Sequence, residues 1–138
     1  MTKRELYGVR DLRKIIHDTE IYVDMLRERV KNTTPILDGM PHAAPLDSRI
    51  ERFMLEIAEL SRELEVYREE LLRRSVTLTN KISRAITDKQ QRSVLLMRYV
   101  SCLSFKEICD TMNLSRSTVY ALHRLAIENL DLRQTCNL

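Results

Sequence analysis

Glycine, proline and tryptophan are scarce in this chain of 138 residues, which has two glycines, three prolines and no tryptophan. Folds rich in β-strands need glycine and proline in their turns, and β-branched or aromatic residues in their strands. Leucine, isoleucine, arginine and glutamate are abundant instead, and most of them favour helices. We therefore expect an all-α protein, with one or two small domains.

Cysteines and long apolar runs are also lacking. Cys102, Cys109 and Cys136 are odd in number and show no Cys-x-x-Cys or Cys/His spacing, so we expect neither a disulfide framework nor a zinc site. No apolar run reaches the roughly 18 to 20 residues of a membrane helix. The charged start Met1-Thr-Lys-Arg-Glu is not followed by the apolar core of a signal peptide. These absences predict a cytoplasmic protein with reduced thiols and no membrane contact.

Signals of catalysis and of metal or cofactor binding are missing as well. The chain has no glycine-rich phosphate loop, nucleophile elbow or paired carboxylates on a defined scaffold. His17, His42 and His123 lie far apart, and none has a second histidine or cysteine three or four residues later. We expect no catalytic residues, no metal, no cofactor and no enzymatic activity. The net charge of +3 permits nucleic-acid binding without arguing for it.

The first part of the chain carries two heptad stripes, in which apolar residues recur at alternating steps of three and four. The first stripe has Thr19 as its one polar position and otherwise consists of Val9, Leu12, Ile16, Val23, Leu26 and Val30. The second consists of Ile50, Phe53, Ile57, Leu60, Leu64, Tyr67 and Leu71. Between them, residues 32–46 hold all three prolines and Gly39, which predicts a loop.

Two such helices joined by a loop predict a helical hairpin, coiled-coil-like, over residues 1–86. Each stripe then packs against the other within one chain, or against a second hairpin in a homodimer. The second register slips at Arg74 and resumes at Ser75, Leu78 and Ile82, which indicates either a stutter or the end of the paired region. The simpler interpretation of residues 1–86 is a spacer or dimerisation arm, and the alternative is a dedicated partner-binding surface.

Residues 87–138 have a different pattern, which predicts a small helix-turn-helix domain. Thr87-Asp-Lys-Gln and Ser104-Phe-Lys-Glu are two capping boxes that start helices, and Ser115 is the expected N-cap of a third. Asn113 stands where the turn needs a left-handed conformation. The packing template between two crossing helices is filled by Phe105, Ile108, Cys109, Met112, Leu114, Val119 and Leu122.

The third of these helices has two faces. We expect Val119, Leu122, Ala126, Ile127 and Leu130 to form its buried stripe. The expected recognition surface, which would read base edges in the major groove, consists of Ser115, Arg116, Ser117, Tyr120, Ala121 and Arg124. Ser104, Lys106 and Thr118 are the expected phosphate contacts. The simpler alternative to a DNA-reading helix-turn-helix is an ordinary helical hairpin that does not bind nucleic acid.

This part of the chain resembles the fourth region of bacterial sigma factors. The resemblance rests on Leu95-Leu-Met-Arg-Tyr, on Leu103-Ser-Phe-Lys-Glu-Ile and on Leu114-Ser-Arg-Ser-Thr-Val, and it covers about a third of the chain. It is especially similar to the region in small phage- or prophage-encoded transcriptional regulators that pair it with an N-terminal helical segment. The resemblance implies contact with double-stranded DNA and with RNA polymerase, as a late-gene activator or sigma-like accessory factor. Residues 1–86 lack the aromatic cluster of a promoter-melting region, so a complete sigma factor is not expected.

The first hypothesis is therefore a sequence-specific DNA-binding transcriptional regulator that acts as a homodimer. The second is a coiled-coil interaction protein that docks on RNA polymerase or another regulator without reading DNA, and a phage terminase recognition subunit is the third. The basic cluster Arg73, Arg74, Lys81 and Arg84 is either a phosphate-contacting flank or a solvated helix face.

Overall fold

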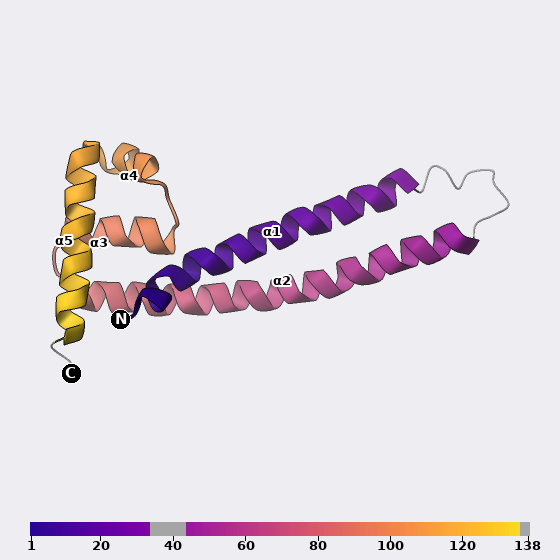
Figure 1. The fold of residues 1–138 in the computed structure, drawn as a ribbon, viewed down its shortest axis with the longest axis horizontal. Coiled ribbons are helices and arrows are strands. Elements are labelled where there is room, and N and C mark those ends of the chain that lie inside the picture. The colour runs from indigo at the N-terminus through magenta and orange to yellow at the C-terminus, as the bar shows by residue number, and fades with distance from the viewer. Residues whose placement is uncertain (34–43, 136–138) are drawn as a thin grey trace. The chain divides into compact units, whose positions relative to one another are not determined.

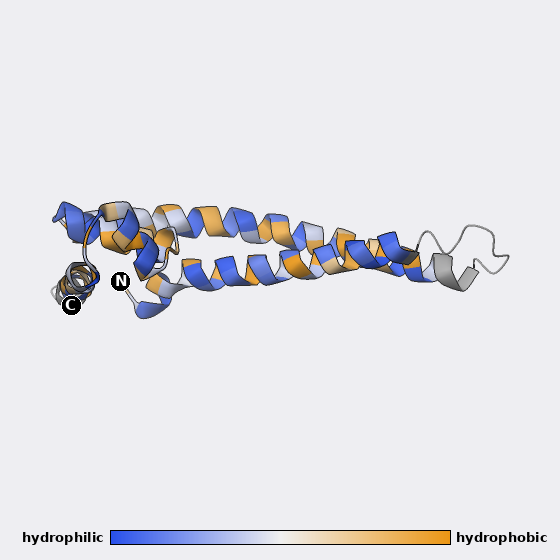
Figure 2. Ribbon diagram, turned by 90° about the horizontal axis from the view of Figure 1, so that it is seen from above, coloured by the Kyte–Doolittle hydropathy of each residue, from blue (hydrophilic) through white to orange (hydrophobic). Residues whose placement is uncertain are grey.

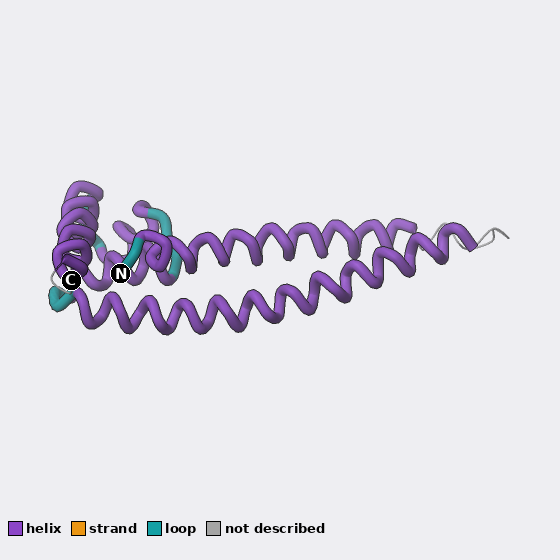
Figure 3. Tube along the Cα trace, turned by 60° about the horizontal axis from the view of Figure 1, so that its bottom comes forward, coloured by secondary structure: helices purple, strands orange, loops and turns teal. Residues whose placement is uncertain are grey.

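The computed structural model describes the backbone of residues 1–33 and 44–135, and the side chains of residues 1–33 and 48–130. All regular structure in these ranges is helical, which confirms the predicted all-α class (Figures 1 and 3). The elements in chain order are α1 (Lys3–Thr33), α2 (Ala44–Ala85), α3 (Lys89–Leu95), η2 (Leu96–Val100), α4 (Phe105–Met112) and α5 (Arg116–Thr135). Two long helices thus precede a group of shorter ones, as expected.

The predicted loop over residues 32–46 is too long at both ends. Helix α1 continues through Asn32 to Thr33, and α2 already begins at Ala44. Proline bars the helical conformation only from the residue before it, so Pro35 leaves Thr33 helical. A proline in the first turn of a helix is tolerated as well, because the N–H that it lacks would have no partner there. Residues 34–43, with His42, lie outside the described residues.

The chain forms two compact units. Unit 1 consists of Met1–Leu12 and Leu71–Leu138, and unit 2 consists of Arg13–Glu70. The sequence places the domain boundary at residues 86 and 87, whereas in the structure the start of α1 and the end of α2 belong with the shorter helices. This difference arises because residues from α1 and α2 belong to the core of unit 1.

In unit 2, the middle and end of α1 and the first part of α2 form an antiparallel hairpin within one chain. Figure 2 shows apolar residues recurring between hydrophilic ones along both helices. Ile16, Val23, Leu26 and Leu64 are buried, and the other positions of the second stripe are half-buried. The polar contacts between the helices include those from Tyr22 to Glu56 at 2.8 Å and from Arg68 to Glu20 at 2.7 Å. Both are exposed, so the apolar stripes contribute more to stability than these contacts do.

Unit 1 is built around a core to which α1, α2, α3, η2 and α5 contribute. Its buried residues are Leu6, Val9, Leu78, Ile82, Ile86, Leu95, Tyr99, Ala126 and Leu130. The first two come from α1 and the next three from the end of α2 and the residue after it, while the rest come from the predicted helix-turn-helix domain. The base of the hairpin is therefore part of the core that carries this domain, which explains the shifted boundary.

The register slip at Arg74 is a stutter. Helix α2 continues to Ala85, Arg74 is exposed, and Leu78 and Ile82 are buried in the same core as Leu6 and Val9 of α1. The pairing of the two long helices thus continues past Arg74 with the shifted phase that the sequence indicates.

The connection from α3 to α4 differs in detail from the prediction. Asp88 and not Thr87 is the N-cap of α3, and its carboxylate accepts from the N–H of Gln91 at 2.9 Å. A carboxylate caps better than a hydroxyl because it also interacts with the helix dipole. Helix α3 then passes into the single π-turn η2, which ends at Val100, and Cys102, two residues later, has a φ of 58°. Neither a π-turn nor a left-handed cysteine has a signal in the local sequence.

No helix within the described residues has both the length and the apolar character that crossing a bilayer requires.

Candidate nucleic-acid interface

The start of α4 is fixed by a capping box, as predicted. The N–H of Glu107 donates to the Ser104 hydroxyl at 3.2 Å, and the Glu107 carboxylate accepts from the N–H of Ser104 at 2.9 Å. Both residues are exposed, as is Lys106 between them. The Ser104 hydroxyl accepts in this arrangement, so its proton can still be donated to a phosphate oxygen.

The turn between α4 and α5 is tight and is made by Asn113. This residue has φ 54° and ψ 43°, the left-handed conformation that the sequence predicts there. Its own N–H and the N–H of Leu114 both donate to the carbonyl of Cys109, the latter at 3.2 Å. Such a bond from the second residue past the helix is typical of a Schellman ending, which reverses the chain sharply.

Substitutions at Asn113 test this turn. We expect Asn113→Val to lower the free energy of unfolding by about 1 to 2 kcal/mol, because a β-branched side chain is strained in the left-handed region. Asn113→Gly is expected to change the free energy of unfolding by less than about 0.5 kcal/mol. Glycine adopts the left-handed conformation without strain, but it also loses more conformational entropy on folding, and the two effects offset each other. Urea unfolding measures both changes in stability, provided that the variants and the natural chain have equal m-values. Equal stability of the valine and glycine variants would contradict the left-handed turn.

A second core cluster holds α4 and α5 together. Val94, Ile108 and Val119 are fully buried. Around them pack the half-buried apolar residues Met97, Leu103, Phe105, Cys109, Met112, Leu114 and Leu122. All seven positions of the predicted packing template therefore meet in one place, with the small side chain of Cys109 among them. The helix-turn-helix packing that the sequence predicts is present.

Helix α5 is 20 residues long and presents the two faces that its sequence predicts. Val119, Ala126 and Leu130 are buried, and Leu122 and Ile127 are half-buried. From Ser115 onward, each residue expected to read or contact DNA is exposed, namely Ser115, Arg116, Ser117, Thr118, Tyr120, Ala121 and Arg124. We call these seven residues the α5 surface. The apolar Leu125, 48% exposed, lies beside it.

The first turn of α5 is organised by Ser115. Its hydroxyl accepts from the N–H of Thr118 at 3.3 Å, which makes Ser115 the N-cap as predicted. It also lies 2.8 Å from the Thr118 hydroxyl and 3.3 Å from the Ser117 hydroxyl. Three hydroxyls thus gather where the helix dipole is positive and favours anions.

Aromatic and cationic contacts connect the α5 surface to the preceding elements. The ring of Tyr120 lies against that of Phe105, with 4.6 Å between centroids. The guanidinium of Arg98 lies 4.5 Å from the centroid of the same Phe105 ring and donates to the carbonyl of Leu103 at 3.0 Å. Sequence reasoning did not single out Arg98, although it lies within a segment that carries the family resemblance. Arg98 holds the end of η2 against the start of α4.

Behind the α5 surface, His123 is joined to η2. Its Nε2 lies 2.7 Å from the hydroxyl of Tyr99, which can donate to the neutral imidazole. Burial is the main reason why the pKa of His123 is lowered, and Arg98 lowers it further. Burial, with nearby Tyr7, raises the pKa of Tyr99 to about 12, so this hydroxyl stays protonated. A further bond, from Asn129 to Gln91 at 2.8 Å, fixes α5 to α3.

The lowered pKa of His123 predicts acid sensitivity. The unfolded state binds a proton near pH 6.5 and the folded state only at lower pH, so stability is complete above about pH 7 and falls on acidification through 6.5. We expect the Tm of the natural chain to fall more between pH 7.5 and 5.5 than that of His123→Gln, which cannot titrate. Parallel Tm curves for the two proteins would disprove the role of His123.

The histidines and cysteines of the chain form no metal site within the described residues. His17 is exposed, and Cys102 and Cys109 are half-buried. Within the ranges that the structure describes, no three His, Cys, Asp or Glu side chains are grouped so that they could hold a metal ion. Cys136 lies outside the described residues.

Comparison with known proteins gives one match. Residues 50–131, more than half of the chain, match the model of a family described as a protein of unknown function, DUF1492. The chain belongs to the DUF1492 family. The DUF1492 match runs from the first part of α2 into α5 and thus includes the turn at Asn113 and the α5 surface. No curated protein and no solved structure matches the chain.

Proposed function

We propose that this DUF1492 protein is a sequence-specific DNA-binding transcriptional regulator and not an enzyme. The observation that carries the proposal is the exposed α5 surface on a tightly packed pair of crossing helices. Arg116 and Arg124 offer guanidinium groups, which suit guanine edges and phosphates, and Ser117 and Tyr120 offer hydroxyls. A rigid helix with such an exposed face is what reading the major groove requires.

The rest of the α5 environment supports the same role. The hydroxyls of Ser104, Ser117 and Thr118 and the amine of Lys106 are exposed at the starts of α4 and α5. Helix starts favour anions, so these groups suit the phosphates on either side of the groove. Ala121 adds a small apolar side chain that suits a thymine methyl group.

From the resemblance to sigma region 4, we place this regulator among phage or prophage late-gene activators or sigma-like accessory factors. It would act in the cytoplasm beside RNA polymerase. An accessory role also agrees with residues 1–86, whose long helices can pair with another chain. These residues do not resemble the region with which a complete sigma factor binds a second promoter element.

We also propose a homodimer, formed through the outer face of α2 in unit 2. Leu55 and Val66 are 65% and 63% exposed and lie eleven residues apart, about three helical turns, so they share one face. Met54, beside them, is 59% exposed. Exposed apolar side chains on one face, with the exposed Glu59 and Arg62 between them, suit a second helix that brings the opposite charges.

Charge on this face is expected to prevent pairing. Leu55→Glu with Val66→Glu should turn a dimer into a monomer in sedimentation equilibrium, because two carboxylates would be buried without partners. Arg13→Glu, at an exposed position of α1, is the matched control and should leave the dimer intact. A natural chain that sediments as a monomer at all concentrations would refute the homodimer.

Binding to DNA fragments tests the main proposal. The full chain is titrated against labelled fragments that span its own gene and the neighbouring genes, at two salt concentrations and with unlabelled random DNA as competitor. We expect one fragment to be bound at least about a thousandfold more tightly than random DNA, with affinity falling as salt rises. Equal and weak binding to every fragment would overturn the proposal.

A second candidate function has an observation in its favour. Ala121 and Leu125, four residues apart on α5, are both exposed and apolar, and such a pair also suits a protein surface. The chain would then dock on RNA polymerase or another regulator and would not read DNA. Purified RNA polymerase retained by the natural chain and lost by Leu125→Asp, with no DNA preference, would favour this function.

A further inference from the structure

The side chain of Arg98, in η2, lies over an aromatic ring instead of beside a carboxylate. Its guanidinium is 4.5 Å from the centroid of the Phe105 ring, and it donates to the carbonyl of Leu103 at 3.0 Å. Arg98 forms no ion pair within the part of the chain that the structure describes. The face of an aromatic ring attracts a cation, and the attraction is stronger when both groups are partly removed from water, as these half-buried side chains are. Arg98 and Phe105 therefore restrain each other.

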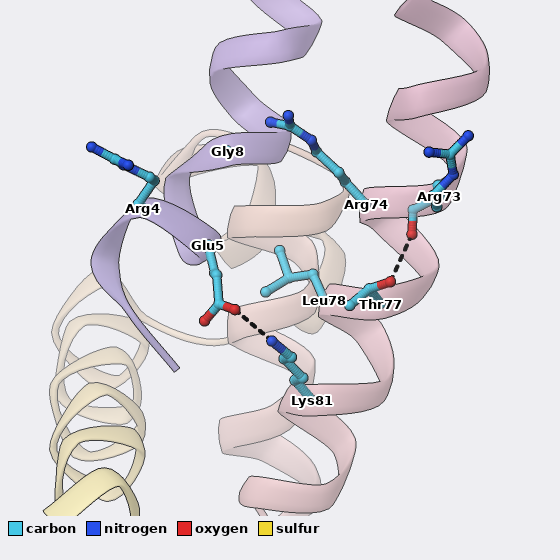
Figure 4. A pocket seen from close by; sticks show the side chains of 8 residues that line it. All are labelled: Arg4, Glu5, Gly8, Arg73, Arg74, Thr77, Leu78 and Lys81. Carbon is cyan, nitrogen blue, oxygen red and sulfur yellow. Dashed lines mark hydrogen bonds and ion pairs between the residues drawn. The ribbon is translucent and has the colours of Figure 1, made fainter.

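The arginines near the base of the hairpin are arranged differently. Arg4, Arg73 and Arg74 border a hollow between the start of α1 and the last third of α2, but their guanidinium groups point apart (Figure 4). Lys81, beside them, pairs with Glu5 (Figure 4). These groups therefore share no point at which one anion could bind. The charge of Arg98, by contrast, is directed at a ring that contacts the α5 surface.

The Phe105 ring packs over one turn of α5. Its centroid lies 4.6 Å from that of the Tyr120 ring, with 37° between the planes, and 5.2 Å from that of the His123 ring, with 89° between them. Residues three positions apart on a helix are neighbours on its surface, so the two α5 rings can both reach Phe105. The capping box of Ser104 and Glu107 fixes the backbone at the start of α4, where Phe105 is the first residue. The Phe105 ring is thus restrained by its own helix, by η2 and by α5.

Tyr120 has the surroundings of a residue that binds a partner. It is 43% exposed, and its hydroxyl has no hydrogen-bond partner among the described residues. A tyrosine with a packed ring and a hydroxyl in water is typical of binding surfaces. A ring that is already held in place also loses less conformational entropy on binding than a freely rotating ring. The contact with Phe105 therefore prepares Tyr120 for binding.

We propose that Arg98 is a positioning residue for DNA reading, which acts through the Phe105 ring to hold Tyr120 in the orientation that contacts DNA. From this orientation the Tyr120 hydroxyl donates to an acceptor atom of the DNA. This role depends on the proposed function, because it concerns a further residue for the same α5 surface. Direct contact of the Arg98 guanidinium with a phosphate is the competing outcome of the test.

A double-mutant cycle on DNA affinity tests the proposal. The natural chain, Arg98→Gln, Tyr120→Ala and the double variant are titrated with the preferred fragment and followed by fluorescence anisotropy. Glutamine can still donate to the Leu103 carbonyl, but it has no charge for the ring. We expect Arg98→Gln to weaken binding by about fivefold or more in the natural chain, and by less than about twofold where Tyr120 is already alanine. Combined with Arg116→Ala, which lies outside these ring contacts, the losses should multiply.

Two further measurements separate positioning from folding. Arg98→Lys keeps a cation for the ring and should bind DNA within about threefold of the natural chain. Arg98→Gln should have the helix content of the natural chain by circular dichroism. In NMR spectra of the free protein, Arg98→Gln should nevertheless move the ring signals of Tyr120, because the restraint on the Phe105 ring between them is lost.

Several results would overturn the proposal. An equal loss on Arg98→Gln with and without Tyr120 would make Arg98 a direct DNA contact. Natural DNA affinity in Arg98→Gln, or unmoved Tyr120 signals, would remove the positioning role. Equal losses for Arg98→Lys and Arg98→Gln would show that the charge over the ring does not act. If the natural chain prefers no fragment, the proposed function fails and this role with it, whereas multiplying losses on a preferred fragment overturn this role alone.

Discussion

Residues 87–138, produced without the rest of the chain, are expected to be mostly unfolded. Five of the nine buried residues in the larger core of unit 1 precede residue 87, namely Leu6, Val9, Leu78, Ile82 and Ile86. A piece of about fifty residues is marginal even with a complete core. Circular dichroism and thermal unfolding of this piece, beside the full chain, measure the effect. A cooperative transition with native helix content would contradict it.

A single substitution tests the same core within the full chain. Ile82 is fully buried, and Ile82→Ala is expected to lower the free energy of unfolding of unit 1 by about 2 to 5 kcal/mol. Leu72→Ala is the matched control on the same helix, because Leu72 is 67% exposed and its loss should change stability by less than about 0.5 kcal/mol. Similar losses for the two variants would mean that the end of α2 is not part of this core.

Alanine at Arg116 or Arg124 is expected to weaken binding to the preferred DNA fragment by about 1 to 3 kcal/mol for each arginine. The loss should be larger for the preferred fragment than for random DNA where the arginine contacts a base. Where it contacts a phosphate, the loss should be uniform and the salt dependence smaller. Fluorescence anisotropy at several salt concentrations separates the two cases.

Arg13→Ala is the control for these variants, because Arg13 is exposed on α1 and belongs to unit 2. It should bind like the natural chain. Arg116 and Arg124 are both exposed, so their loss should leave the Tm nearly unchanged. Unaltered DNA affinity in both alanine variants would exclude α5 as the reading helix.

Features set by local chemistry could be predicted from the sequence. The two heptad stripes, the capping box at Ser104 and the left-handed turn at Asn113 depend on residues at most a few turns apart. The same holds for the two faces of α5, whose buried and exposed residues alternate with the helical period. These features determine the helix-turn-helix. Its fold and the exposure of its candidate residues could therefore be predicted from the sequence.

Contacts between distant segments could not be predicted in this way. The stripe of α1 was expected to begin at Val9, although Leu6, one turn earlier, lies in the same core. Nothing local shows that Ile82 and Ile86 pack with Leu130 and not only with α1. The bond between Tyr99 and His123 joins residues 24 apart, and the π-turn η2 before it follows from packing and not from composition.

The core of unit 1 also affects how the protein can be made in a cell. Leu6 and Leu130 share this core although they are 124 positions apart, so it can close only after nearly all of these residues have left the ribosome. Helical proteins usually fold quickly because their contacts are local, whereas this core must bring distant segments together. During synthesis, the residues that α1 and α2 give to this core, Leu6, Val9, Leu78 and Ile82, therefore stay incompletely covered for roughly seconds, a period in which chaperones or a neighbouring nascent chain can bind them.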